Sequence, residues 1–339
     1  MSLSEFEIIQ KYFQTADLAV SREEILLGIG DDSAILSLAA EDQLLISTDV
    51  LVDSVHFPSD ANPEKIATRA LAVNLSDLAA MGAEPLCFTL GLVLADASES
   101  WLQQFSQGLI KLARQYNIAL IGGDLSKGPT TIAIQVHGIA KSGKALRRDA
   151  ANVGDLIFVT GCLGDGAIAL ASMGLPSHLG ASFQLEQDQP SSNCASYFEQ
   201  AYFEPQPRIE FALQCGDYIS SAIDISDGLI GDIGHICTNS RVGAALNVAE
   251  FPYSDSATCC VSTDNLLRAA LFGGDDYELC VTVAKHDREK FQARAEEANT
   301  RISCIGEITE DRKVRCYSGT GEEIPLNENA YRHFQEGNS

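Results

Sequence analysis

The chain has 339 residues, of which 45% are hydrophobic and 21% are charged, so it can bury a large core and is not a disordered protein. Its 47 acidic and 23 basic residues give a formal net charge of −24. That charge argues against a basic nucleic-acid-binding surface and against a polybasic membrane anchor. At about 150 residues per domain, the length predicts about two domains or one large domain.

In the first part of the chain, strand-like apolar runs alternate with helical patterns, which predicts a mixed α/β or α+β class. One helix is expected at 63–81, with a proline at its start and Gly82 at its end. Another is expected at 99–116, with Ser98 as its N-cap. The strands are expected at 43–48, 86–94, 118–121 and 131–140.

A second set of elements begins near Gly154, after a polar joint over 141–153. Its strands are expected at 156–160, 219–225, 244–248, 278–283 and 302–308. Its helices are expected at 166–173, 208–214, 229–238, 265–272 and 286–298. A polar insert over 177–192 indicates a surface loop.

Neither a membrane span nor a secretory signal is recognisable. No apolar run reaches about 18 residues, and the first residues lack a basic region followed by an apolar one. The ten cysteines are scattered and form no C-x-x-C pair, which argues against a zinc ribbon or a thioredoxin motif. We therefore expect a cytoplasmic protein with reduced thiols.

The most informative pattern is a set of Asp residues next to Gly, Ser and Thr, at points where strands are expected to end. The clusters are Gly28–Ser33, Ile46–Asp49, Asn74–Asp77, Gly122–Asp124, Asp224–Gly228 and Gly273–Glu278. A single cluster of this kind is usually a turn or a cap. Six of them favour a site for hard cations such as Mg²⁺, which prefers carboxylate and hydroxyl oxygens. Several such ions could bridge two anionic substrates, as phosphoryl transfer requires.

Other motifs leave alternatives open. Gly138–Ala145 has the spacing of a P-loop, but Ala145 stands where the Mg²⁺-binding hydroxyl is needed. Gly161–Gly166 either holds a phosphate at a helix N-terminus or is a structural turn. His56 either contacts a substrate or is structural. Arg148, next to Arg147, either binds a phosphate or is a solvated basic residue.

These clusters, in this order, resemble the thiamine-monophosphate kinase family along nearly the whole chain. The stretches that carry the resemblance are 28–34, 47–51 with 56–57, 72–83, 122–124, 222–229 and 273–279. Several of these motifs are shared with a wider superfamily of ATP-using enzymes, which includes aminoimidazole ribonucleotide synthetase, selenophosphate synthetase and a hydrogenase maturation protein. The stretch 74–82 and the Gly-Gly-Asp-Asp-Tyr-Glu-Leu motif resemble the thiamine kinase branch specifically.

The resemblance implies a two-domain α/β (α+β) fold like that of aminoimidazole ribonucleotide synthetase. Residues 1–148 would form an N-terminal domain that binds ATP and metal and pairs into a dimeric β-barrel. Residues 149–339 would form a C-terminal α/β domain that closes the active-site cleft. The implied reaction is phosphorylation of thiamine monophosphate to thiamine diphosphate by direct in-line transfer from ATP with several Mg²⁺ ions, the last step of thiamine diphosphate synthesis.

The resemblance also implies roles for individual residues. The implied metal ligands are Asp32, Ser47, Thr48, Asp49, Asp77, Asp124, Asp224 and Asp227, and of these Asp49, Asp77, Asp124 and Asp227 are expected to be catalytic. The implied ATP contacts are Gly123, Asp124, Arg148 and Ser226. The implied contacts to thiamine monophosphate are His56, Asp275 and Tyr331. Asp275 departs from the family, in which Glu is common at this position.

Two alternatives remain from the sequence. One is another enzyme of the same superfamily, of the ribonucleotide cyclo-ligase or selenophosphate synthase type. A selenophosphate synthase favours a reactive Cys near the N-terminus, whereas the first Cys here is Cys87, inside an apolar strand. The other is a non-catalytic protein that binds divalent cations, but no EF-hand loop pattern is present.

Overall fold

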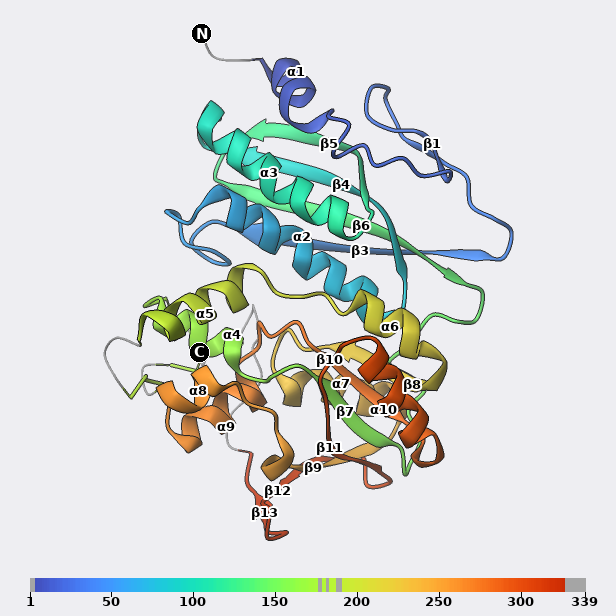
Figure 1. Ribbon diagram of the computed structural model, residues 1–339, viewed down its shortest axis with the longest axis vertical. Helices are drawn as coiled ribbons and strands as arrows, with labels where there is room; N and C mark the ends of the chain where they lie inside the picture. The colour runs from blue at the N-terminus through green and yellow to red at the C-terminus, as the bar shows by residue number, and fades with distance from the viewer. Residues whose placement is uncertain (1–3, 176–178, 181–182, 187–190, 327–339) are drawn as a thin grey trace, which may run out of the picture. The chain divides into compact units, whose positions relative to one another are not determined.

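The computed structural model describes residues 4–175, 179–180, 183–186 and 191–326. The chain divides into two compact units (Figure 1). The first consists of Met1–Leu78 and Gly82–Ala145, and the second of Ala79–Met81 and Leu146–Ser339. The functions expected of domains 1–148 and 149–339 stay predictions.

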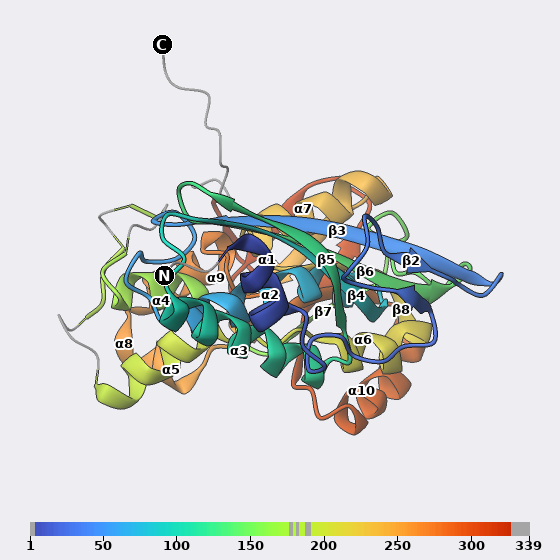
Figure 2. The same cartoon turned by 90° about the horizontal axis from the view of Figure 1, so that it is seen from above.

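The first unit is built on a four-stranded sheet with the strand order β3–β6–β4–β5. Its strands are β3 (Asp42–Val52), β4 (Glu84–Leu94), β5 (Ala119–Lys127) and β6 (Thr131–Lys141). β6 is antiparallel to both of its neighbours, whereas β4 and β5 are parallel. Helices α2 (Pro63–Ala80) and α3 (Glu99–Gln115) cover one face of this sheet (Figures 1 and 2).

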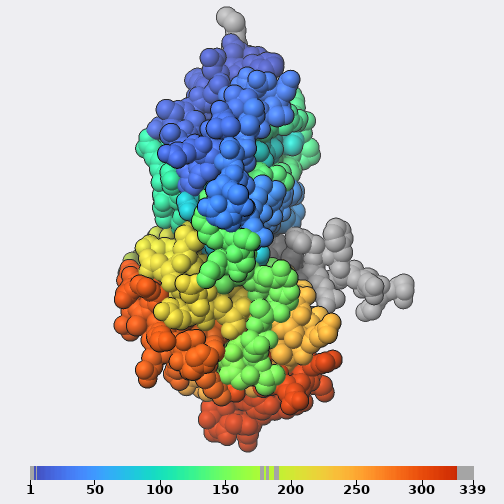
Figure 3. All heavy atoms as spheres, turned by 90° about the vertical axis from the view of Figure 1, so that its right-hand side faces the viewer, coloured from blue at the N-terminus to red at the C-terminus, as the bar shows by residue number. Residues whose placement is uncertain are grey.

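The opposite face of the sheet exposes apolar side chains along β3. Leu44, Ile46 and Val50 are 40%, 55% and 48% exposed, whereas Leu51 is buried. Successive residues of a strand point to opposite faces, so these three share the face away from the helices. Figure 3 views the molecule at right angles to Figure 1, and blue atoms make up much of the surface that the first unit shows in that view.

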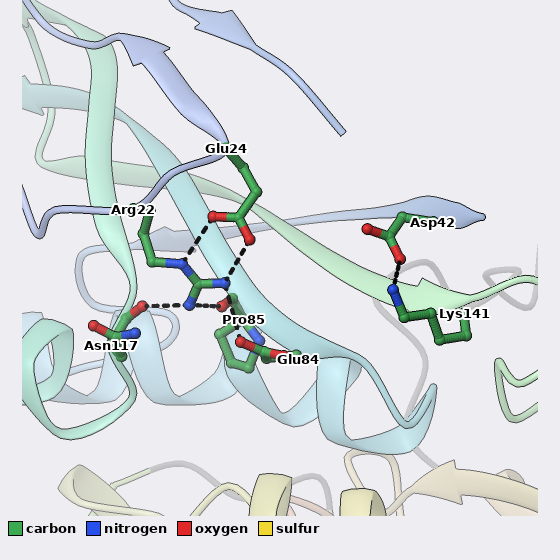
Figure 4. A network of polar contacts seen from close by, with 7 residues as sticks. All are labelled: Arg22, Glu24, Asp42, Glu84, Pro85, Asn117 and Lys141. Atoms are coloured by element: carbon green, nitrogen blue, oxygen red, sulfur yellow. Dashed lines mark hydrogen bonds and ion pairs between the residues drawn. The ribbon is translucent and has the colours of Figure 1, made fainter. Parts of the chain in front are cut away.

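The segment before β3 is fastened to the sheet by one buried guanidinium. Arg22 donates to the carboxylates of Glu24 and Glu84 and to the backbone carbonyls of Pro85 and Asn117, over distances of 3.0 to 3.5 Å (Figure 4). These contacts position the hairpin whose loop carries the first Asp cluster. The elements of this segment are α1 (Glu5–Ile8), the π-helical turn η1 (Ile9–Phe13), β1 (Ile25–Leu27) and β2 (Ile35–Leu36).

A seven-stranded sheet with the order β13–β12–β9–β11–β7–β10–β8 forms the core of the second unit. Among the described strand pairs of this sheet, β12 and β9 are parallel and the others are antiparallel. β10 is buried along its whole length, and Phe158 and Phe211 contact Phe291 edge-on beside the sheet. The strands are β7 (Leu156–Thr160), β8 (Ile219–Asp224), β9 (Gly243–Asn247), β10 (Leu279–Val283), β11 (Ile302–Thr309), β12 (Val314–Tyr317) and β13 (Glu323–Ile324).

Seven α-helices of the second unit lie within the described residues. They are α4 (Asp165–Ser172), α5 (Ser192–Phe203), α6 (Ile209–Cys215), α7 (Leu229–Ser240), α8 (Asp255–Cys260), α9 (Thr263–Phe272) and α10 (Arg288–Glu297). The short 3-10 turns are η2 (Gly216–Tyr218), η3 (Val248–Glu250) and η4 (Lys285–Asp287). Throughout the described part of the chain, no helix has both the length and the apolar character to span a membrane.

The expected elements are present, but two strand limits were wrong in a way that matters. β3 continues past Thr48 to Val52, and β5 continues past Ile121 to Lys127. Asp49 and Asp124 therefore lie within strands rather than after them, because pairing with β6 and with β4 extends the ladders. The missed elements are the N-terminal turns and hairpin, α5, α8, β12 and β13.

Candidate active site

Ser47, Asp49 and Asp77 form a polar cluster between β3 and α2. The Ser47 hydroxyl donates a short hydrogen bond to the Asp77 carboxylate. The Asp49 backbone N–H donates to Asn74 Oδ1 at 3.0 Å, and Asn74 Nδ2 donates to the Ala70 carbonyl at 2.9 Å. Sequence reasoning gave Asn74 no role of its own, although its motif was singled out. It is fully buried and fastens β3 to α2.

The electrostatics of this cluster favour a bound cation. Burial, and secondarily the charge of Asp77, raise the pKa of Asp49 to about 6. Two carboxylates and a hydroxyl are oxygen donors of the type that Mg²⁺ prefers. A divalent ion placed between them would compensate the lost solvation of Asp49 and its repulsion by Asp77, the two causes of the raised pKa. These residues therefore fit a magnesium ion.

A second group of predicted residues lines a cavity of about 650 Å³ in the first unit. Asp31, Asp32, Gly123 and Asp124 contribute to its wall. Asp31 Oδ1 accepts from the Asp32 N–H at 2.8 Å, so Asp31 shapes the turn. A Cβ atom on Gly123 would lie 2.0 Å from the Leu90 carbonyl oxygen, so only glycine lets β5 approach β4 this closely.

The strand register separates the predicted ligands of the first unit. Asp124 is paired with Gly91, Gly91 with Ala133, and Ala133 with Val50. Directly paired residues share a face, so Asp124 lies on the face of Val50 and Thr48, opposite to the face of Asp49. Thr48 Oγ1 there accepts from Gln135 at 3.1 Å. The structure thus brings Ser47, Asp49 and Asp77 together, but it places Thr48 and Asp124 on the other face.

In the second unit, the turn after β8 carries three predicted residues. Asp224 ends β8 and is 5% exposed. The N–H groups of Ser226 and Asp227 both donate to one oxygen of Asp232, at 3.1 and 3.2 Å. Burial, then the charges of Asp224 and Asp227, raise the pKa of Asp232 to about 8. Asp232 is not among the predicted site residues. The available signal was an Asp among the apolar residues of the first turns of α7.

The Gly273–Glu278 motif packs against that turn. The Asp275 N–H donates to the Ser226 carbonyl at 2.9 Å, and a Cβ on Gly274 would lie 2.3 Å from the same oxygen. Asp275 has φ 61° and Tyr277 has φ 50°, a left-handed conformation that non-glycine residues adopt only when contacts hold them there. Tyr277 Oη donates to Asp275 Oδ1 at 3.2 Å.

The turn between β7 and α4 is not a phosphate cradle. The N–H groups of Gly164 and Gly166 donate to the two carboxylate oxygens of Asp276, at 2.8 and 3.0 Å. The structural alternative for Gly161–Gly166 is therefore the correct one. Gly138–Ala145 is likewise no P-loop, because its first half is the end of β6 and no helix follows it.

Asp275 also borders a cavity of about 490 Å³ within the second unit. Glu278 lies in its wall, where Arg208 Nε donates to it at 2.7 Å and the Thr160 hydroxyl donates to the same carboxylate. Across the cavity, Tyr197 Oη donates to Asp165 at 2.6 Å. Carboxylates dominate this wall, with Arg208 as a basic partner, so the cavity suits a ligand that carries positive charge.

The remaining predicted residues are less constrained. His56 Nδ1 accepts from the Val52 N–H at 3.0 Å, which holds the ring beside the end of β3. The Arg147 side chain forms an ion pair with Asp149. Arg148 is exposed, and its carbonyl accepts from the Ser240 hydroxyl at 2.9 Å. Tyr331 lies outside the described residues.

No group of three or more His, Cys, Asp or Glu side chains within the described ranges is already arranged around one metal position.

Comparison with known proteins places this geometry in a family. The model for the N-terminal domain of AIR synthase related proteins matches residues 30–140, and the model for the C-terminal domain matches 152–318. Thiamine-monophosphate kinase of Escherichia coli strain K12 is 41% identical over 334 residues, which cover 98% of this chain and 99% of that protein. The chain belongs to the thiamine-monophosphate kinase family. The expected two-domain fold of the AIR synthase type is confirmed.

Solved structures of this family agree with the fold. Thiamine-monophosphate kinase from Stenotrophomonas maltophilia K279a matches with a TM-score of 0.82 and 39% identity, over 96% of this chain and 99% of that one. A structure described as AaThiL complexed with AMPPCP and TMP matches with a TM-score of 0.72 and 27% identity, over 98% of this chain and 99% of that one.

Proposed function

We propose that this protein transfers the γ-phosphoryl group of ATP to thiamine monophosphate and so forms thiamine diphosphate. The observation that carries the proposal is the paired carboxylates Asp49 and Asp77 beside Ser47, in a chain whose full-length curated relatives are thiamine-monophosphate kinases. The relative complexed with AMPPCP and TMP supports the same pair of substrates.

Magnesium ions are part of the proposal. Ser47, Asp49 and Asp77 are proposed to hold one ion on the helix side of the sheet in the first unit. Asp32, Thr48 and Asp124 are proposed as further ligands in the first unit, with Thr48 and Asp124 on the opposite face of that sheet. Asp224 and Asp227 are proposed as ligands in the second unit. When bound, Mg²⁺ supplies the positive charge that lets two phosphate-bearing substrates approach and that balances charge on the leaving group.

The chain's own residues are proposed to orient the substrates rather than to activate a nucleophile. A phosphate monoester has a second pKa near 6, so its terminal oxygen is ionised at neutral pH and needs no general base. That oxygen attacks the γ-phosphorus in line, and ADP leaves. Asp49, Asp77, Asp124 and Asp227 are the proposed catalytic residues, because they would hold the charge-neutralising ions. This mechanism agrees with the position of His56 Nδ1, which already accepts a backbone hydrogen bond.

Substrate contacts are proposed on the same basis. Gly123, Asp124, Ser226 and Arg148 would contact ATP, and of these the exposed Arg148 guanidinium could reach a phosphate. His56, Asp275 and Tyr331 would contact thiamine monophosphate. The carboxylate-rich wall beside Asp275 supports this assignment, because the thiazolium ring of thiamine carries a positive charge.

We also propose that the protein is a homodimer whose copies meet over the exposed face of β3. Leu44, Ile46 and Val50 give that face an apolar stripe, which water covers in a monomer at a cost of about 25 cal/mol per Å². Light scattering on the purified protein should give twice the chain mass, and Ile46→Glu should shift it toward the monomer. A monomeric native protein contradicts this proposal.

The test of the activity is product analysis with purified protein, ATP, Mg²⁺ and thiamine monophosphate. Free thiamine and a sample with EDTA serve as controls. We expect thiamine diphosphate only from the monophosphate, and none with EDTA. ATP binding in Mg²⁺ without this product would instead favour another enzyme of the AIR synthase superfamily, and a panel of ribonucleotide and selenide substrates would then identify it.

A further inference from the structure

In two turns of the second unit, a pair of backbone N–H groups donates to a carboxylate of the protein itself. The proposed function does not use this feature. Asp232 accepts from Ser226 and Asp227, and Asp276 accepts from Gly164 and Gly166. Neighbouring N–H groups of this kind usually form a concave site for a phosphate or another anion. Here the protein fills both positions itself.

Asp232 lies in the first turns of α7 and reaches back across the start of that helix. Its N–H donates to the Gly228 carbonyl at 3.1 Å, which places it on the helix, while its side chain bonds to the two residues before Gly228. Gly228 has φ 102°, and a Cβ there would lie 2.7 Å from the Phe272 backbone. The chain therefore turns sharply at Gly228, and Asp232 fixes the strand side of the turn. Asp232 is 3% exposed, so water does not compete for these bonds.

Asp276 does the same for the neighbouring loop. Its half-buried carboxylate joins Gly164 and Gly166, at the start of α4, to the loop that holds Asp275 in a left-handed conformation. The Gly166 position is close-packed, because a Cβ there would lie 2.5 Å from the Asp275 backbone. Removing the Asp276 carboxylate would release the Asp275 backbone from α4.

We propose that Asp232 and Asp276 are positioning residues, that is, carboxylates that occupy the anion positions of two turns. Asp232 thereby presets Ser226 and Asp227, which lie in its turn. Asp276 ties the β7–α4 turn to its own loop and thereby presets its neighbour Asp275. This inference rests on the proposed function for the roles of the residues that are positioned. It also means that the turn amides do not bind the substrate phosphates. Anions in this unit would instead be bound through side chains and through the metal ions that those side chains would hold.

The hydrogen-bond geometry predicts that replacing Asp by Asn has different effects at positions 232 and 276. Both N–H groups at Asp232 use a single oxygen, Oδ2, so the one carbonyl oxygen of Asp232→Asn can accept both bonds. Asp276 uses both of its oxygens, so Asp276→Asn would turn its NH₂ group toward one of the two glycine N–H donors. Asn should therefore substitute for Asp232 but not for Asp276.

The experiment compares Asp232→Asn, Asp232→Ala and Asp276→Asn in the full-length protein. Hydrogen–deuterium exchange measures the protection of the turn amides. The affinity for Mn²⁺ without nucleotide tests whether the metal ligands are in place. Steady-state kinetics gives KM for ATP and KM for thiamine monophosphate separately. Asp155→Ala is the matched control. Like Asp232, Asp155 is buried and accepts a turn N–H, from Asn152 at 2.9 Å. It lies just before β7, whereas the turn that Asp276 contacts follows β7. The length of that strand, about 17 Å at about 3.3 Å per residue, separates the two.

We expect Asp232→Ala to lose protection at Ser226 and Asp227 and to weaken Mn²⁺ binding by about 10- to 100-fold, as removing an outer partner of a metal ligand does. KM for ATP should rise with it, and Asp232→Asn should stay close to wild type in all three readouts. Asp276→Asn should lose protection at one glycine and raise KM for thiamine monophosphate rather than for ATP. Asp155→Ala should change thermal stability alone.

Two results would overturn the proposal. If Asp232→Asn is as damaging as Asp232→Ala, the charge of Asp232 matters and not its hydrogen bonds. If Asp276→Asn is as well tolerated as Asp232→Asn in the exchange and kinetic measurements, the positioning argument is wrong, and this comparison remains available even if Asp232→Ala does not fold. Exchange and Mn²⁺ affinity need no turnover, so they separate this inference from the proposed function, which fails only if the wild-type protein makes no thiamine diphosphate.

Discussion

Replacing Asp49 by Asn should stabilise the metal-free protein while it abolishes turnover. Burial and the charge of Asp77 raise the pKa of Asp49 from 3.8 to about 6. Since the folded-state pKa lies above the unfolded one, this group's contribution to stability is complete below about pH 4 and is lost as the pH rises through about 6. A shift of about two units corresponds to about 3 kcal/mol, which is the cost of the ionised Asp49 at pH 8.

The assay is urea unfolding of wild type and Asp49→Asn in EDTA, at pH 5 and at pH 8. The variant should be more stable than wild type by about 3 kcal/mol at pH 8 and by about half of that at pH 5, where the unfolded-state carboxyl is ionised and the folded one is still protonated. Mg²⁺ should then raise the stability of wild type at pH 8 more than that of the variant. A difference between the two proteins that is the same at both pH values would refute this reasoning, as would a variant that turns over normally.

Three further changes test other parts of the site. Asp77→Asn should remove Mg²⁺-dependent product formation and leave the circular dichroism spectrum unchanged, and near wild-type activity would contradict the multi-metal site. Gly123→Ala forces a Cβ against the Leu90 carbonyl and should cost about 3 kcal/mol in urea unfolding, so an unaffected midpoint would mean that β5 can move away from β4. Arg208→Ala leaves the largely buried Glu278 without its ion pair. The free energy of unfolding should fall by about 2 kcal/mol, which lies between the values for exposed and for buried ion pairs. Equal stability of Arg208→Ala and wild type would show that Glu278 relaxes into water.

The local signals in the sequence predicted most of the regular elements. Pro63 and Ser98 mark the first residues of α2 and α3 as expected, because a helix start is decided by residues within one turn of it. The apolar runs of β4, β6 and β7 were equally clear. The same signals are weak in α8, which has six residues, and in β13, which has two, and these elements form only because neighbouring elements pack on them.

The resemblance carried by the Asp motifs identified the family, and comparison with full-length relatives confirmed it. The individual site assignments stay predictions, but the structure shows which of them lie together. Ser47 and Asp77 are joined by a hydrogen bond, whereas Thr48 and Asp124 belong to the other face of the sheet. Residue type and order along the chain hold no information about strand register, and register decides the face.

The sequence by itself therefore determined the fold class, the family and the chemical character of the site, because each depends on residue types and their local spacing. Only the tertiary structure decided what each Asp does. Asp227 lies in a turn whose amides bond to Asp232, and Asp275 is the chain neighbour of Asp276, which accepts from the amides of the β7–α4 turn. All four are acidic residues in or near similar motifs. Burial and the direction of the neighbouring N–H groups, both set by packing between distant segments, separate the residues that can meet a ligand from those that position them.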